Sequence, residues 1–144
     1  MAVITPVVPD IQKGIIVYLQ GLTDAGDKVM DIPHRSSKAP FIIVTWEGII
    51  QQSDTRVPRA RITIDVFAQS PSHAKYIARQ VREALVPPEN VTYGVHAEVQ
   101  YTDYEEEVPR TIVLSGATVE SGPREGPEQR ERIITTYLVD YYGR

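Results

Sequence analysis

The sequence predicts an α+β fold in which an antiparallel or mixed β-sheet of four to five strands carries two helices packed on one face. Three observations support this class. The chain has 144 residues of which 42% are hydrophobic, enough for one core. Several segments alternate apolar and polar residues with the period of a strand, and two repeat apolar residues with the period of a helix. The whole chain, residues 1–144, is therefore interpreted as a single domain.

The first helix is expected over about residues 9–22. Pro9 suits the first turn, where its missing N–H would have no intrahelical partner. The apolar stripe of this helix comprises Ile11, Ile15, Tyr18, Leu19 and Leu22. Gly14 weakens the helix and Gly21 favours its end.

Residues 23–40 are rich in turn-forming residues and contain a short apolar island at Val29 and Met30. Residues 41–50 are rich in β-branched and aromatic residues and predict a strand that is covered on both faces. Residues 60–68 predict a second strand, because apolar and polar residues alternate strictly until Phe67 interrupts the polar face.

The second helix follows where the period changes, within the stretch "ARITIDVFAQSPSHAKYIARQVREAL" (residues 60–85). Ser70 is a good N-cap and Pro71 fits the first helical position. The apolar stripe of this helix comprises Ala74, Ile77, Ala78, Val81 and Leu85, and it ends before Pro87. This stripe indicates that the helix lies on a sheet or on another helix.

Two or three further strands are expected: residues 91–101 and 133–141 predict two of them, and residues 110–119 would form the third. Residues 120–131, "ESGPREGPEQRE", are rich in glycine, proline and charge and contain little that can be buried. They predict a loop that is mobile in the isolated chain and becomes ordered against a neighbouring subunit, with Arg124 and Arg130 as its contact residues.

No catalytic motif is found in the sequence. There is no cysteine, and His34, His73 and His96 do not have the spacing of metal ligands. Glu105, Glu106 and Glu107 stand in a row beside a proline, which indicates solvated carboxylates rather than a general acid and base. The sequence predicts a protein that is not an enzyme and that uses no cofactor and no metal.

The candidate interface residues are charged. Lys75, Arg79 and Arg82 share one side of the second helix, and this stripe could contact nucleic acid, an acidic protein surface, or only solvent. Basic and acidic patches on one small domain could also pair between copies in a head-to-tail ring. The candidates for a subunit or partner interface are Arg59, Arg61, Lys75, Arg79, Arg82, Glu105, Glu106, Glu107, Arg124 and Arg130.

The formal net charge of -4 argues against a dedicated nucleic-acid binder, whose domains usually carry a clustered basic excess. No apolar run approaches the ~20 residues that a membrane-spanning helix needs. The N-terminal segment lacks a basic region followed by an apolar one, so no signal peptide is expected.

The stretches "APFIIVTWEG" and "RARITIDVFAQSPSHAKYIARQVREAL", together with the closing "RERIITTYLVDYYG", resemble the tail terminator and tail completion proteins of long-tailed bacteriophages. The resemblance covers residues 9–86 and 130–142 as a layout of elements, and residues 87–129 add little to it. It carries no catalytic motif, so it assigns no active site.

The resemblance implies a virion protein that forms a homo-oligomeric ring, commonly a hexamer, at the head-proximal end of the tail tube. Such a ring stops polymerisation of the tube protein and offers a surface to the head connector, while phage DNA passes through the lumen without specific binding. Two other classes remain open at this point. One is a neighbouring neck, head-to-tail joining or minor tail protein, and the other is a small cellular enzyme or binding domain.

Overall fold

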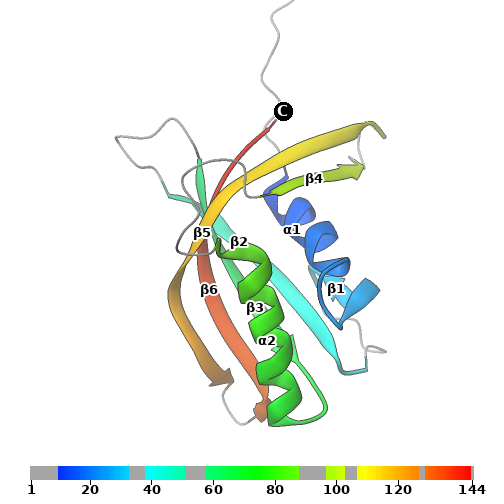
Figure 1. Ribbon diagram of the computed structural model, residues 1–144, viewed down its shortest axis with the longest axis vertical. Coiled ribbons are helices and arrows are strands. Elements are labelled where there is room, and N and C mark those ends of the chain that lie inside the picture. Colours follow the sequence, from blue (N-terminus) through cyan, green and yellow to red (C-terminus); the bar gives the residue numbers. More distant parts are fainter. Residues whose placement is uncertain are drawn as a thin grey trace, which may run out of the picture.

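The computed structural model describes residues 10–32, 38–50, 58–87, 97–102, 107–126 and 129–143. Within these residues the chain forms two α-helices, one 3-10 turn and one six-stranded sheet, with both helices packed against the same core (Figure 1). The elements in chain order are α1 (Ile11–Gln20), η1 (Gly26–Lys28), β1 (Val29–Met30), β2 (Phe41–Ile50), β3 (Arg59–Phe67), α2 (Pro71–Leu85), β4 (Ala97–Thr102), β5 (Pro109–Gly126) and β6 (Gln129–Gly143).

Helix α1 is shorter than the sequence predicts. Asp10 caps it, with its side chain accepting a hydrogen bond from the Lys13 amide at 3.0 Å. Ile11, Ile15 and Leu19 are buried as expected. The assignment of Leu22 to the apolar stripe is wrong: Leu22 lies beyond the C-cap at Gly21, and its side chain is 48% exposed.

Helix α2 confirms its sequence pattern closely. The Ser70 hydroxyl accepts a hydrogen bond from the His73 amide at 3.1 Å, and Pro71 occupies the first turn. Of the predicted stripe, Ala74, Ile77, Val81 and Leu85 are buried, and Ala78 is partly buried. The helix packs on β6 and also touches β3 and β5.

The sheet has the strand order β1-β2-β3-β6-β5-β4. The prediction of four to five strands is wrong, because the apolar island at Val29–Met30 forms a further strand, β1. Strand β1 runs parallel to β2, while all other neighbouring strands are antiparallel, so the sheet is mixed. The sequence does not predict this strand, because two residues have too little alternation to show a period.

Strand β3 lies near the middle of the sheet and confirms its predicted alternation. Its core face carries Ala60, Ile62, Ile64 and Val66, all buried, while the residues between them are partly exposed on the other face. The expected strand over 91–101 appears as β4 from Ala97, and residues 91–96 lie outside the described residues.

The predicted loop over residues 120–131 is wrong where the structure describes it. Strand β5 continues to Gly126 and β6 already begins at Gln129, with Arg124 opposite Ile134 and Glu125 opposite Ile133. Several register shifts between Val119 and Gly126 accommodate the glycines and proline within the ladder. Pairing to the apolar β6 supplies the stabilisation that the composition of this segment lacks.

Helix α1 lies inside the curl of the sheet and contacts both ends of it (Figure 1). At one end the Gln12 side-chain amide donates to the Val44 carbonyl at 2.9 Å. At the other end the Asp10 amide donates to the Tyr101 hydroxyl of β4 at 3.0 Å. Gly14 fits against β5, since a Cβ there would lie 2.7 Å from Cδ1 of Ile112.

Replacing Ile77 by alanine is expected to lower the free energy of unfolding by about 2–5 kcal/mol, because this side chain is fully buried on the core-facing side of α2. Arg79→Ala, two residues further along the same helix and exposed, should change it by less than about 0.5 kcal/mol. Urea denaturation of both variants measures the difference. Equal losses would show that α2 presents a different face to the sheet.

Gly122→Ala tests the extended β5–β6 hairpin. Gly122 has a φ of +92°, and a Cβ there would lie 2.6 Å from the Ile134 carbonyl oxygen. The variant should lose more than about 1 kcal/mol of stability and the hydrogen-exchange protection of the β5 amides near it. Ser121→Ala, next to it and exposed, is the matched control and should retain both.

Candidate functional site

A groove of about 440 Å³ lies between α2 and the β5–β6 hairpin. Helix α2 forms one wall, β5 the other, and β6 the floor between them. The lining residues are Lys75, Ala78, Arg79, Arg82, Val119, Pro123, Arg124, Glu125, Ile133, Thr135 and Tyr137.

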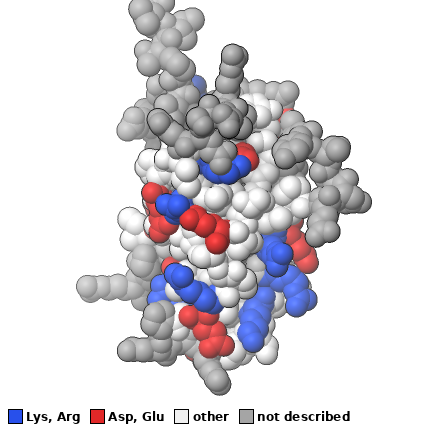
Figure 2. Space-filling view, turned by 90° about the vertical axis from the view of Figure 1, so that its left-hand side faces the viewer, with Lys and Arg blue, Asp and Glu red and all other residues white. Residues whose placement is uncertain are grey.

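Positive charge is concentrated along this groove. Lys75, Arg79 and Arg82 follow each other at helical spacing on α2, and Arg124 faces them from β5. All four are exposed, and Glu125 is the one acidic residue of the lining. Figure 2 shows this gathering of blue side chains at the lower right of the molecule. No ion pair within the described part of the chain neutralises them.

The floor of the groove is apolar. Ile133 and the Tyr137 ring are buried, and Val119 and Ala78 are half-buried beside them. Burial raises the pKa of the Tyr137 hydroxyl to about 12, while the charge of Arg82 and a hydrogen bond with Thr135 partly oppose that rise. A partner in this groove would therefore meet cations at the rim and hydrocarbon below.

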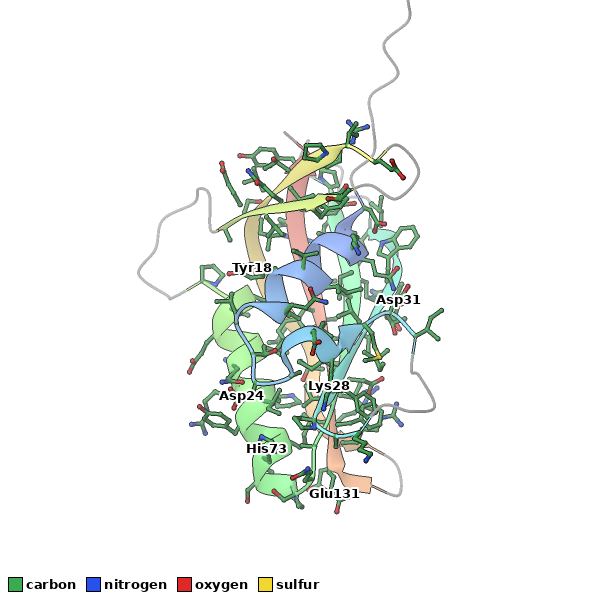
Figure 3. All side chains as sticks on the ribbon, turned by 90° about the vertical axis from the view of Figure 1, so that its right-hand side faces the viewer. Tyr18, Asp24, Lys28, Asp31, His73 and Glu131 are labelled. Carbon is green, nitrogen blue, oxygen red and sulfur yellow. The ribbon has the colours of Figure 1, made fainter. Side chains whose placement is uncertain are left out.

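Two contacts on the other side of α2 fix its orientation. The Tyr18 hydroxyl of α1 donates to the Ala84 carbonyl at 2.8 Å. The Asp24 amide donates to Gln80 Oε1 at 3.0 Å. Tyr18 and Asp24 both lie beside α2 in Figure 3. Because this side of α2 is held by α1 and the turn after it, the basic side faces the hairpin.

The face of the sheet that carries no helix has a different electrostatic character. Three arginines there form two-point ion pairs with carboxylates: Arg59 with Asp140 at 2.7 Å, Arg61 with Glu120 at 2.8 Å and Arg132 with Asp65 at 3.0 Å. Figure 2 shows blue and red side chains in contact on the side of the molecule that faces the viewer. Arg61 holds the pKa of the Glu120 carboxyl below its ordinary value, chiefly through the hydrogen bond between them.

Phe67, which interrupts the polar pattern of β3, also lies on this helix-free face. Its ring stacks on Phe41 of β2 with the centroids 4.6 Å apart. The Arg132 guanidinium lies 5.1 Å from the centre of the Phe67 ring. Phe67 therefore interrupts the polar pattern of β3 because it packs against Phe41 and Arg132 within the chain.

The structure separates the predicted interface residues into groups. Lys75, Arg79, Arg82 and Arg124 meet at the groove, although the last comes from a segment distant in sequence. Arg59 and Arg61 lie on the opposite face in ion pairs. Glu107 is exposed at the start of the β5 region, far along that strand from the groove. Glu105 and Glu106, and the side chain of Arg130, lie outside the described residues.

Sequence reasoning missed the floor of the groove. Ile133, Thr135 and Tyr137 alternate along β6, and the sequence predicts for them only membership of a closing strand. Pro123 falls within the predicted loop over residues 120–131. Only the pairing of β5 with β6, together with the position of α2, brings them together, and no local pattern reports such pairing.

Among the described residues, no group of three or more His, Cys, Asp or Glu side chains is arranged to hold a metal ion. No helix in that part of the chain has the length and apolar character needed to cross a membrane.

The comparisons with known proteins detect similarity in fold. No protein-family model matches the chain, and no curated protein matches its sequence. Among the solved structures that match is a chain described as "Virion of native gene transfer agent (GTA) particle". The two share 19% sequence identity and superpose with a TM-score of 0.51, over 85% of this chain and 83% of that one. This chain therefore shares its fold with a chain of a gene transfer agent virion.

The buried Tyr137 hydroxyl predicts how the free energy of unfolding depends on pH. This hydroxyl has a folded-state pKa of about 12, above the ordinary 10.0, so its contribution to stability is complete below pH 10 and is lost as the pH rises toward 12. The free energy of unfolding should fall by up to about 2–3 kcal/mol more in the wild type than in Tyr137→Phe over that interval. Tyr76→Phe, whose ring is exposed on α2, should behave as the wild type. A parallel decline in all three proteins would contradict the burial of Tyr137.

Proposed function

We propose that this protein is a structural subunit of a phage-like virion, and more specifically a tail terminator. In this role it forms a ring, commonly hexameric, on the head-proximal end of the tail tube. The ring ends polymerisation of the tube protein, presents a docking surface to the head connector, and lets DNA pass through its lumen. No catalytic step, cofactor or membrane belongs to this function.

The observation that carries the proposal is the shared fold with the gene transfer agent virion component. The similarity extends over 85% of this chain and 83% of the other, so it concerns the whole domain rather than a common supersecondary motif. The sequence layout of "RITIDVFAQS" leading directly into an amphipathic helix supports the same class.

The surfaces of the molecule also suit an assembly subunit. The groove beside α2 has exposed cations around an apolar floor, which is the arrangement of a protein-binding surface. The long β5–β6 hairpin gives a rigid support for contacts at both of its ends.

Electron microscopy of tail tubes assembled with and without the purified protein tests the proposal. Tubes formed in its presence should have a controlled length and carry a ring at one end only. Rings bound to isolated head connectors but never to tubes would instead assign the chain to the joining proteins of the neck. Protein that associates with neither would contradict a role in the virion.

Ile77→Ala serves as a stability control for that experiment, because its side chain lies in the core and outside the groove lining. Tube capping by this variant should fail only under conditions in which the protein is unfolded, which circular dichroism reports at the same temperature. Loss of capping by a folded Ile77→Ala variant would show that the assay responds to core packing rather than to the surfaces of the subunit.

A further inference from the structure

We infer that the groove between α2 and the β5–β6 hairpin is a socket for the acidic segment 103–108 of a second copy of this chain. Subunits would then join head to tail, with the acidic segment of one copy seated between Lys75, Arg79, Arg82 and Arg124 of the next. The inference deepens the ring-forming function proposed above and rests on it.

The groove defines the chemistry of its occupant. Four exposed basic side chains and a single acidic one line it, and Ala78, Val119 and Pro123 are the apolar residues of the lining that keep exposed surface. Such a surface selects a segment with several carboxylates and one or two apolar side chains. The charges set orientation and rate of association, and the apolar contacts add affinity.

Residues 103–108 have this composition. Their sequence is "DYEEEV", with carboxylates at Asp103, Glu105, Glu106 and Glu107 and apolar groups at Tyr104 and Val108. Within the described residues Glu107 and Val108 are both exposed, although valine is ordinarily buried. The segment joins β4 to β5, whose ladder ends with Thr102 opposite Pro109.

A chain cannot insert its own acidic segment into its own groove. Pro109 begins β5, whereas Arg124 of the groove stands near the end of the same strand. At a rise of about 3.3 Å per residue, the 15 residue steps from Pro109 to Arg124 span roughly 50 Å along the strand. Figure 1 shows the two ends of β5 at opposite ends of the molecule. Contact between them must be intermolecular, and a repeated contact between two different patches closes into a ring or extends into a filament.

A nucleic acid is the less suitable polyanion for this groove. The chain as a whole has a net charge of -4, which opposes association with a long polyanion. The apolar floor would also stay uncovered beneath a phosphate backbone, whereas Tyr104 or Val108 could cover it.

A peptide experiment tests the socket without requiring a ring. The peptide YTDYEEEVP, residues 101–109, is titrated into the full-length ¹⁵N-labelled protein, and amide shifts are followed by NMR. Saturable shifts are expected in α2 and in residues 119–125, and they should weaken with added salt. The peptide YTNYQQQVP should produce none of them.

Charge reversal locates the site. Arg79→Glu with Arg82→Glu should weaken peptide binding by at least about tenfold, because two attractive charges become repulsive. Lys28→Glu with Lys38→Glu changes the net charge equally at residues outside the groove lining and should leave binding unchanged. Shifts absent at millimolar peptide, or equally weakened in both variants, would overturn the inference. Preferential binding of a duplex oligonucleotide at the same amides would overturn it in favour of nucleic acid.

Mixing the variants tests the contact between copies. Arg79→Glu/Arg82→Glu and Glu106→Lys/Glu107→Lys should each fail to assemble, as read by native mass spectrometry. Their equimolar mixture should regain the wild-type assembly, because every socket then meets a segment of opposite charge. Asp27→Lys with Asp31→Lys is the control for the second variant and should assemble normally.

Different results would contradict the socket and the tail-terminator function. Rings that form in both separate variants would remove the socket while leaving the tail-terminator function intact. A wild-type protein that forms no ring and caps no tube would remove that function, while the peptide titration still decides whether the groove binds this segment.

Discussion

The packing of α1 inside the curl of the sheet is the constraint on which the rest of the structure depends. The helix contacts β1 and β2 at one end of the sheet and β4 at the other. Gly14 permits this approach, because a side chain there would meet Ile112 at 2.7 Å. Hydrogen bonds from Gln12 to Val44 and from Asp10 to Tyr101 fix the helix at both sides. A sheet held in this curl keeps one face for the helices and leaves the other to solvent or partners.

The fixed position of α1 also determines where α2 lies. Tyr18 bonds the carbonyl of Ala84, and the turn after α1 bonds Gln80, so one side of α2 is occupied. The basic side is consequently directed at the β5–β6 hairpin and forms a groove with it. On the helix-free face of the sheet, Asp65, Glu120 and Asp140 compensate the charges of three arginines. Around the groove, the cations have no compensating ion pair among the described residues. Charge that a fold leaves uncompensated is available for association.

The long strands β5 and β6 connect the two surfaces that this chain would use in assembly. Strand β5 extends from the acidic segment at its beginning to the basic groove near its end. Ladder pairing with β6 makes this connection stiff, and the irregularities near Gly122 bend it without breaking it. A rigid element with opposite charges at its two ends is suited to a repeated contact between identical subunits.

The sequence by itself determined the features that depend on local periodicity. The limits of α2, the Ser70 cap, the core face of β3 and the basic stripe of Lys75, Arg79 and Arg82 all follow from residue spacing. It failed where structure depends on distant partners. The two-residue strand β1 and the end of the β5–β6 hairpin form because neighbouring strands offer hydrogen bonds, which outweigh a turn-like composition. The groove likewise required the tertiary structure, since Arg124 and Tyr137 reach α2 only through sheet pairing. Side-chain periodicity can be recognised in the sequence itself. Strand pairing joins segments that lie far apart in the sequence, so which strands pair is determined only in the folded chain.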